Sequence, residues 1–186
     1  MADRIAPRDD IAMMDGYHSP QVAVDVRLNT NESPLPPPQA FVDELTARIG
    51  DVAWNRYPDR AARELRGRLA ALHGTAADRI FVANGSNEVL QTLALTYGGP
   101  GRSVAVFEPT YAMHSQIARV AGSTVLVGGR ADDLALDLDE VRRLVTGSEP
   151  AITFLCSPNN PTGLVESRET VLEVLGLVEA VGGLLV

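Results

Sequence analysis

The sequence predicts an α/β fold in which helices pack on both faces of a mostly parallel sheet, giving three layers. Two observations support this prediction. From about residue 79 onward, short apolar segments alternate with segments in which apolar residues recur every three or four positions, as in buried strands and amphipathic helices. The strand-like segments are apolar throughout, which is typical of parallel sheets covered on both sides.

Two helices are expected ahead of this alternating region. The first spans 39–49, and its apolar residues fall on one face. Asp59 is expected to cap the second helix, which ends at Gly74. The residues of this second helix that are expected to face inward are Leu65, Leu69 and Leu72.

In this region, strands and helices are expected to alternate along the chain. The strands are expected at 80–83, 103–107, 124–127, 152–156 and 184–186, and the helices at 86–97, 111–121, 139–145 and 167–180.

Residues 1–38 are expected to form an extended N-terminal arm, because prolines recur along this stretch and block helix formation. The remaining residues, 39–186, are expected to form part of one α/β domain. Its last strand begins at Leu184 without the loop that would follow it, and ligands bind beside such loops in parallel sheets. We therefore expect the chain to be a fragment of a longer protein.

Composition and charge argue against several classes of protein. Hydrophobic residues make up 45% and charged residues 22%, the balance of a soluble globular protein, and no apolar run is long enough to span a membrane. The net charge of −8 with scattered arginines argues against nucleic acid as a partner. Cys156 is the only cysteine and the N-terminus lacks the apolar core of a signal peptide. A cytoplasmic protein is expected, and the three histidines show no metal-site spacing.

Two short segments are candidates for ligand binding. Gly85 permits a tight turn, and the amides of Ser86 and Asn87 at the following helix start can hold a phosphate. The Ser86 hydroxyl can instead cap that helix, which is common turn chemistry. Tyr111 follows a strand, and its ring can stack on a flat heteroaromatic cofactor or pack within the next helix. Taken singly, neither segment decides between ligand binding and local structure.

A third segment, residues 156–163 with the sequence CSPNNPTG, is more specific. Two prolines and a glycine make a rigid, non-helical loop directly after a strand. Such a loop can hold an asparagine amide over the edge of the sheet, where the amide can donate to an oxygen of a cofactor. Ordinary turns use the same residue types, but this order of eight residues is much harder to attribute to chance.

Together these segments resemble those of fold-type I pyridoxal-phosphate aminotransferases. Residues 157–163 look like the Asn-Pro-Thr-Gly loop of that family, 109–111 like its Pro-Thr-Tyr element, and 85–87 like its phosphate-binding turn. Residues 28–34 (LNTNESP) and 55–59 (NRYPD) are similar to segments at matching places in histidinol-phosphate aminotransferases. The five segments occur in the expected order, and the resemblance runs from about residue 26 to residue 186.

The resemblance implies which residues bind the cofactor, pyridoxal 5′-phosphate. Gly85, Ser86 and Asn87 would hold its phosphate. Tyr111 would stack on its ring, and Asn160 would donate to its phenolic oxygen. The implied fold is the aminotransferase large domain, incomplete and preceded by the arm.

The resemblance also implies a substrate and an assembly. Tyr57 would reach the phosphate of the cofactor in a neighbouring subunit, so the full-length parent is expected to be a homodimer. Asn31 and Glu32 would lie near a small phosphorylated amino substrate. The implied reaction converts histidinol phosphate and 2-oxoglutarate to imidazole-acetol phosphate and glutamate, in histidine biosynthesis. Glu32 begins a Glu-Ser-Pro sequence where a second asparagine is commoner in the family, which puts the identity of the substrate in doubt.

No catalytic residue is assigned, because the chain contains no lysine: all sixteen of its Lys and Arg residues are arginine. In the family, the lysine that carries the cofactor, the aspartate that pairs with the ring nitrogen, and the phosphate- and carboxylate-binding arginines would lie beyond Val186. No side chain present can form an imine with an aldehyde cofactor. The chain alone is therefore expected to be inactive.

Other interpretations stay open. A threonine-phosphate decarboxylase-like enzyme or an aromatic aminotransferase would keep the cofactor and change the reaction. A protein of another class would be a non-catalytic product that binds a phosphorylated ligand or pairs with a full-length subunit. A nucleotide-binding Rossmann module is disfavoured, because residues 98–101 (GGPG) lack the glycine spacing of that motif.

Overall fold

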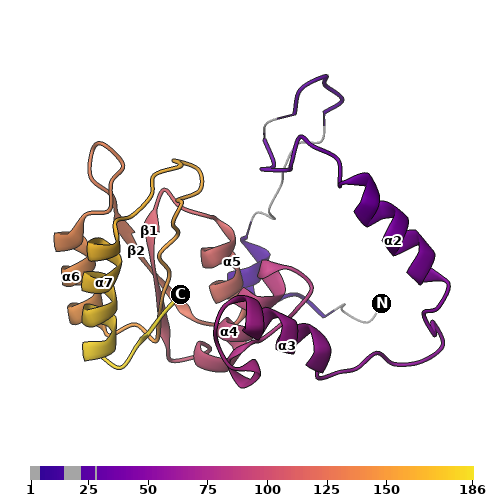
Figure 1. Cartoon of the computed structure of the whole chain (residues 1–186). Coiled ribbons are helices and arrows are strands. Elements are labelled where there is room, and N and C mark those ends of the chain that lie inside the picture. The colour runs from indigo at the N-terminus through magenta and orange to yellow at the C-terminus, as the bar shows by residue number, and fades with distance from the viewer. Residues whose placement is uncertain (1–4, 15–21, 28) are drawn as a thin grey trace. The chain divides into compact units, whose positions relative to one another are not determined.

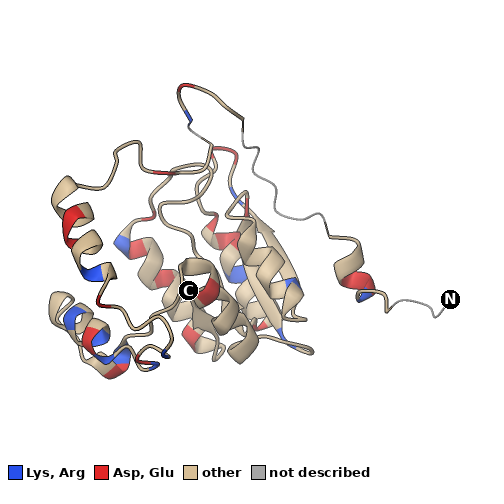
Figure 2. Cartoon of the chain, turned by 90° about the vertical axis from the view of Figure 1, so that its right-hand side faces the viewer, with Lys and Arg blue, Asp and Glu red and all other residues tan. Residues whose placement is uncertain are grey.

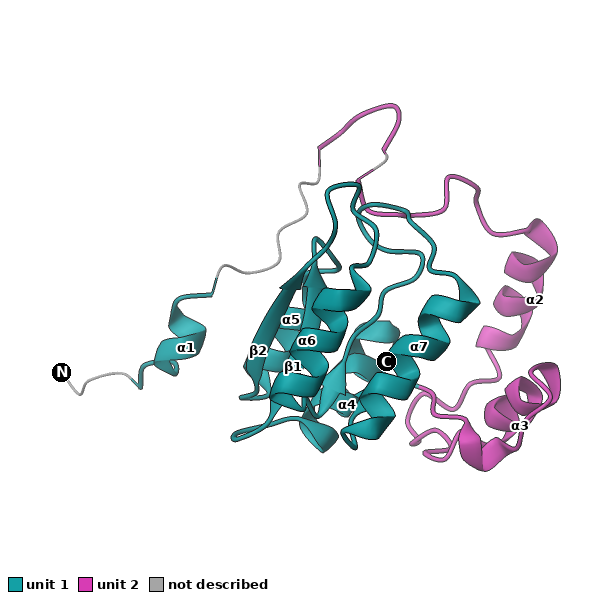
Figure 3. Ribbon diagram, turned by 90° about the vertical axis from the view of Figure 1, so that its left-hand side faces the viewer, with its two compact units in different colours: residues 1–17, 83–186 teal, residues 18–82 magenta. Residues whose placement is uncertain are grey.

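The computed structural model describes residues 5–14, 22–27 and 29–186. Its packing divides the chain into two compact units, shown in different colours in Figure 3. Unit 1 comprises residues 1–17 and 83–186, and unit 2 comprises residues 18–82. The two units are defined by packing within this chain and do not test the predicted division. The arm over 1–38 and the domain over 39–186 therefore stay a prediction.

Unit 1 is built on a parallel sheet of four strands in the order β2-β1-β3-β4. Val104 of β1 pairs with Val125 of β2 and with Ile152 of β3. The predicted parallel sheet is confirmed. The strands are β1 (Ser103–Glu108), β2 (Thr124–Gly129), β3 (Ile152–Thr153) and β4 (Leu184–Leu185).

Helices cover both faces of this sheet, which confirms the three-layer prediction (Figure 1). On one side lie α4 (Ser86–Tyr97) and α5 (Met113–Val120), and on the other α6 (Leu138–Ser148) and α7 (Arg168–Ala180). Successive side chains of a strand point to opposite faces, so β1 contributes to two cores. One contains Val104, Val106, Ala118, Ile152 and Phe154, and the other Phe107, Leu136, Val141, Val145, Val174 and Val178.

Side-chain caps fix where two of these helices begin. Asp137 accepts hydrogen bonds from the amides of Asp139 at 3.0 Å and Glu140 at 3.2 Å, at the start of α6. Ser167 accepts one from the amide of Thr170 at 3.1 Å, at the start of α7. Each cap satisfies amides that have no partner inside the helix.

Unit 2 contains two helices, α2 (Gln39–Ile49) and α3 (Arg63–Leu72), followed by a 3₁₀ turn, η1 (Ala77–Arg79). Both predicted helices are present. Asp59 stabilises the start of α3 as expected, by accepting from the amide of Arg63 at 3.0 Å. The residue in the N-cap position is nevertheless Ala62, with a φ of +44°.

Three expectations about individual segments are wrong. Residues 80–83 follow η1 in an extended conformation, but they pair with no strand of the described sheet. Leu65 and Leu72 of α3 are exposed rather than turned inward. Among the described residues of unit 2 only Ala70 is buried, so this unit offers α3 no core of its own to pack against.

The third correction concerns residues 9–12, which were expected to be extended and instead form a helical turn, α1 (Asp9–Ala12). No proline falls between Pro7 and Pro20, so the chain is free to turn there, and Asp9 and Asp10 favour a helix start. The guanidinium of Arg8 donates to the carbonyl oxygens of Arg119 at 3.0 Å and Val120 at 3.4 Å. These contacts fasten α1 to the carboxyl end of α5.

Acidic and basic residues are interspersed over the helices and loops (Figure 2). Several form pairs one turn apart on a helix, such as Glu44 with Arg48 at 2.7 Å and Glu64 with Arg68 at 2.6 Å. Pairs of this kind, exposed to water, add little to stability. No helix in the described part of the chain is long and apolar enough to cross a membrane.

Candidate functional site

The strand order creates a topological switch point between β1 and β3. The chain leaves β1 through α5 on one face and adds β2 on one side, whereas it leaves β3 through α7 on the other face and adds β4 on the opposite side. The loops after β1 and β3 therefore diverge. In open parallel sheets, ligands bind where such loops part, at the carboxyl ends of the strands. Tyr111 and Asn160 lie in these two loops.

The start of α4 has the features of an anion-binding turn. Gly85 adopts a φ of +85°, which side chains other than glycine rarely allow. No side chain caps this helix, so the Ser86 hydroxyl does not serve as a cap, and the amides of its first turn have no partner within the helix. The carboxylate of Glu88 accepts from the amide of Asn84 at 2.6 Å, which ties the turn to the first turn of α4. Such amides, with the helix dipole behind them, favour a phosphate.

Tyr111 lies beside this helix start. Its hydroxyl donates to the side-chain oxygen of Asn87 at 3.3 Å. Its ring meets the ring of His114 edge to face, with the ring centres 5.4 Å apart and the planes at 88°. The predicted phosphate turn and the predicted ring-stacking tyrosine are thus in contact.

The ring of His114 packs against the ring of Tyr111. The sequence interpretation did not predict this contact. The His114 ring is buried and stacks on Phe154, with the ring centres 4.4 Å apart and the planes 4° from parallel. Burial lowers the pKa of His114 to about 4, so the imidazole is neutral near pH 7. Its place three residues after Tyr111, one helical turn on, is the sequence signal that could have indicated this contact.

The loop after β3 is held by Asn159 rather than Asn160. Asn159 is 2% exposed, and its side-chain oxygen accepts from the Thr110 hydroxyl at 2.9 Å. Its nitrogen donates to the carbonyl of Pro109 at 3.0 Å and to the hydroxyl of Thr162 at 2.9 Å. Asn160 is half-buried. The sequence pattern indicated Asn160 and not Asn159, although the two asparagines are adjacent in the loop.

A buried ion pair ties the same loop to the sheet. The side chains of Arg130 and Glu166 are 2% and 9% exposed and lie 3.1 Å apart. Arg130 also donates to the carbonyl of Phe107 in β1 at 3.2 Å, and the amide of Glu166 donates to the Ser157 hydroxyl at 2.9 Å. Because breaking a buried pair leaves an uncompensated charge, Arg130 and Glu166 fix the end of the loop against β1. Their separation of 36 residues gave no sequence signal.

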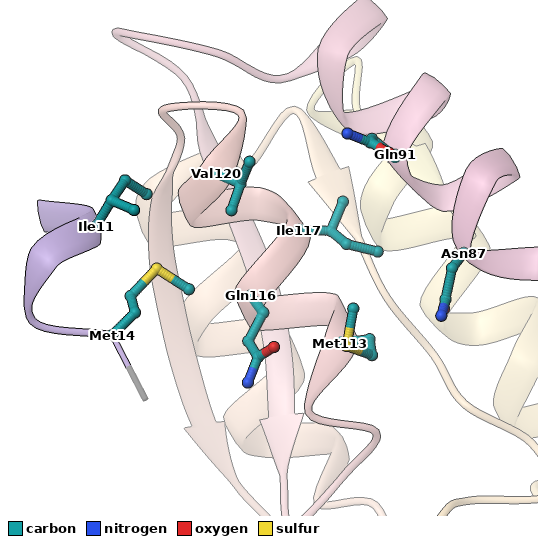
Figure 4. Close-up of a pocket in the computed structure, with 8 residues that line it drawn as sticks. All are labelled: Ile11, Met14, Asn87, Gln91, Met113, Gln116, Ile117 and Val120. Atoms are coloured by element: carbon teal, nitrogen blue, oxygen red, sulfur yellow. The ribbon is translucent and has the colours of Figure 1, made fainter. Parts of the chain in front are cut away.

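A cavity of about 400 Å³ lies between α1, α4 and α5 (Figure 4). Ile11 lines it from α1 and Met14 from the segment just after α1, Asn87 lines it from α4, and Met113 and Ile117 line it from α5. Most of this lining is apolar, so the cavity itself does not suit a phosphate. Asn87 is the residue shared between the cavity and the Tyr111 side of the site.

The other predicted site residues belong to unit 2. Tyr57 is almost fully exposed. Glu32 forms an exposed ion pair with Arg27 at 3.6 Å, and Asn31 has a φ of +54°. Their expected contacts with a substrate or a neighbouring subunit stay predictions. No cluster of three metal-ligating side chains occurs in the ranges that the structure describes.

The fold and these loops define an α/β domain in which an uncapped helix start, a tyrosine ring and an asparagine-containing loop meet near the switch point of a parallel sheet. Residues 23–186 match the family model for class I and II aminotransferases. The chain belongs to the aminotransferase class I and II family.

Curated relatives and solved structures agree with this family. The chain is 42% identical to a histidinol-phosphate aminotransferase of Frankia casuarinae over 97% of this chain and 48% of the relative, and 40% identical to one of Corynebacterium diphtheriae over 94% and 50%. A crystal structure of histidinol-phosphate aminotransferase from Sinorhizobium meliloti in complex with pyridoxal-5′-phosphate superposes with a TM-score of 0.83 at 20% identity, over 99% of this chain and 50% of that one. The chain thus spans about half the length of the curated relatives it matches.

Proposed function

We propose that this chain forms part of a pyridoxal-phosphate-dependent transaminase that converts histidinol phosphate and 2-oxoglutarate to imidazole-acetol phosphate and glutamate. One observation carries the proposal. In a chain of the aminotransferase family, an uncapped helix start, an aromatic ring and an asparagine loop are tied together at the switch point of the sheet. The names of the relatives from Frankia casuarinae and Corynebacterium diphtheriae support the choice of substrate.

The residues present fit pyridoxal phosphate. Its phosphate matches the uncapped amides of Ser86 and Asn87, next to Gly85 with its positive φ. Its planar ring matches the ring of Tyr111, which His114 and Asn87 hold in place. Its phenolic oxygen matches the donor amide of Asn160.

Each of these residues would bind or orient rather than react. When bound, the cofactor supplies an aldehyde that accepts the amino group and a ring that withdraws electrons. The α4 amides would anchor the phosphate end, Tyr111 would cover one face of the ring, and Asn160 would hold the phenolic oxygen by a donated hydrogen bond. The neutral imidazole of His114 would keep Tyr111 in place without adding a charge beneath the ring.

The proposal extends to assembly and substrate contacts. Tyr57 would reach the cofactor phosphate of a second subunit in a homodimer, which its exposed ring in unit 2 permits. Asn31 and Glu32 would contact the phosphorylated amino substrate. A cytoplasmic location suits a chain with one cysteine and with no membrane-spanning helix among its described residues.

The test uses a chain extended past Val186 along its own reading frame and loaded with pyridoxal phosphate. Adding histidinol phosphate should convert the bound cofactor from its aldehyde form to its amine form, which an absorbance change reports. Adding 2-oxoglutarate should reverse that change. Cofactor that stays in the aldehyde form would exclude histidinol phosphate as the donor.

Two comparison substrates separate the alternatives in the same experiment. Release of carbon dioxide from phosphothreonine would identify a decarboxylase instead, and faster conversion by an aromatic amino acid would identify an aromatic aminotransferase. A protein that binds no cofactor at all would contradict the whole proposal.

A further inference from the structure

The side chain of Asn159 connects the two loops that part at the switch point. Asn159 as a whole is 2% exposed, and it lies 49 residues from Thr110 and 50 from Pro109 in the chain. Its contacts with these residues join the loop after β1 to the loop after β3 at the carboxyl edge of the sheet. Among the described residues, these two bonds of Asn159, one of them to the Thr110 hydroxyl, are the side-chain hydrogen bonds that join the two loops.

The geometry uses the full hydrogen-bonding capacity of the amide nitrogen. One N–H group donates to Pro109 at 3.0 Å and the other to Thr162 at 2.9 Å, while the oxygen accepts from Thr110 at 2.9 Å. An aspartate would offer no donor, and a glutamine would be longer by one methylene group. The chemistry of this position therefore requires an asparagine.

The backbone of Asn159 adds to this rigidity. Its amide donates to the carbonyl of Leu164 at 2.7 Å, and its carbonyl accepts from the amide of Gly163 at 2.7 Å. These two bonds close the loop upon itself. The loop is thus stiff internally, and the side chain of Asn159 fixes its distance from the loop after β1.

The residues next to this connection are the ones with proposed cofactor roles. Tyr111 follows Thr110 directly, and Asn160 follows Asn159 directly. We propose that Asn159 is a positioning residue whose side chain sets the separation between the Tyr111 ring and the Asn160 amide, so that both engage one ligand ring together. This inference rests on the proposed function, because it takes Tyr111 and Asn160 as the groups that hold the cofactor.

The test measures binding of 4′-deoxypyridoxine 5′-phosphate, which has the ring, phenol and phosphate of the cofactor but no aldehyde. It therefore binds without an imine and suits the 186-residue chain, which has no lysine. Asn159→Ala should weaken binding about tenfold, the effect of losing roughly one well-formed hydrogen bond. The absorbance of the bound phenol should also move toward that of the free probe, because Asn160 no longer holds the phenolic oxygen.

A matched control separates positioning from a general loss of stability. Ser123 is also buried, and it accepts from the amide of Gly99 at 2.8 Å at the start of β2, on the opposite edge of the sheet. Ser123→Ala should leave binding within about twofold of the original chain while costing a similar hydrogen bond. Equal weakening by Asn159→Ala and Ser123→Ala would overturn the proposal.

A double-mutant comparison gives a readout that a merely structural role would not change. If Asn159 acts through Asn160, then Asn159→Ala should have little further effect on the phenol absorbance and affinity once Asn160→Ala is present. Fully additive effects would overturn the inference. If Asn159→Ala does not fold, Thr110→Val removes the partner hydroxyl alone and should weaken binding several-fold.

The two proposals fail in different ways. A chain that does not bind the probe contradicts the proposed cofactor site, and the positioning role falls with it. A chain that binds the probe equally well with and without the Asn159 side chain contradicts the positioning role alone.

Discussion

The sixteen arginines and the absence of lysine decide which amine of this chain can react with an aldehyde. Guanidinium groups stay protonated and do not form imines at neutral pH. After incubation with pyridoxal phosphate and reduction with borohydride, we expect the N-terminal amine alone to carry the pyridoxyl group. Peptide mass spectrometry measures this directly.

Arg168→Lys supplies the positive control for this experiment. Arg168 is exposed at the start of α7, so a lysine there should acquire the label without disturbing the core. A pyridoxyl group on any internal peptide of the unchanged chain would contradict the prediction.

His114 makes the stability of unit 1 depend on pH. Burial lowers its pKa from 6.5 to about 4 in the folded state, so the unfolded chain binds more protons between these values. The stability contributed by the neutral, stacked ring is complete above about pH 6.5 and is lost as the pH falls toward 4. Between about pH 7.5 and pH 5 we expect the free energy of unfolding to fall by about 2 kcal/mol from this residue.

Denaturant titrations at the two pH values test this expectation, with His114→Phe as the reference. Phenylalanine keeps an aromatic ring against Phe154 and cannot take up a proton. The variant should lose less stability on acidification than the original chain, by that same amount. Parallel losses in both chains would show that His114 is not the group responsible.

At the scale of elements, helices were predictable where a periodic apolar face met a clear start or stop signal. The helices over 39–49 and 86–97 have the predicted bounds because Pro38 and Gly85 end the preceding segment. The segment 80–83 has strand-like residues but pairs with no strand in the described part of the chain, since strand pairing depends on residues far away in the sequence. Leu65 and Leu72 were also wrongly predicted to be buried. Periodicity shows which face of a helix is apolar, but whether that face is covered depends on distant residues.

The candidate site was predictable as a set of segments and not as a set of contacts. The loop over 157–163 and the position of Tyr111 follow from local turn and strand signals. The contacts of Asn159 with Pro109 and Thr110, and of Arg130 with Glu166, join residues 36 to 50 positions apart. Only the sheet order brings them together, and no local pattern records that order.

The cap of α6 allows one element to be tested separately. Asp137→Ala removes the acceptor of two first-turn amides, at 3.0 and 3.2 Å, and should lower the free energy of unfolding by about 1 kcal/mol. Thermal or denaturant unfolding followed by circular dichroism measures this change.

Two further substitutions serve as controls for Asp137→Ala. Asp137→Ser keeps an oxygen acceptor and should recover most of the loss. Asp139→Asn removes a charge from the same turn without removing the cap, and should have a smaller effect than Asp137→Ala. An equal effect of Asp139→Asn would mean that charge rather than capping stabilises this helix start.

At the scale of the whole molecule, the two units differ in how much apolar surface they bury. Unit 1 has two buried clusters, one on each face of its sheet. In unit 2, Phe41, Leu45 and Ile49 recur along one face of α2 and are 56%, 51% and 48% exposed. A continuous apolar face of this kind leaves unit 2 with little free energy to hold its helices, because burial of apolar area is the main stabilising contribution.

We therefore expect unit 2 to open before unit 1 in this chain. Limited trypsin digestion should cut first after arginines in unit 2, such as Arg48, Arg56 and Arg60, while residues 103–186 stay protected, because cleavage requires local unfolding. A dye that fluoresces on apolar surfaces should bind the chain, and Leu45→Gln should reduce that signal by shortening the apolar face of α2. Digestion of both units at the same rate, or dye binding that is unchanged by Leu45→Gln, would contradict this difference in stability.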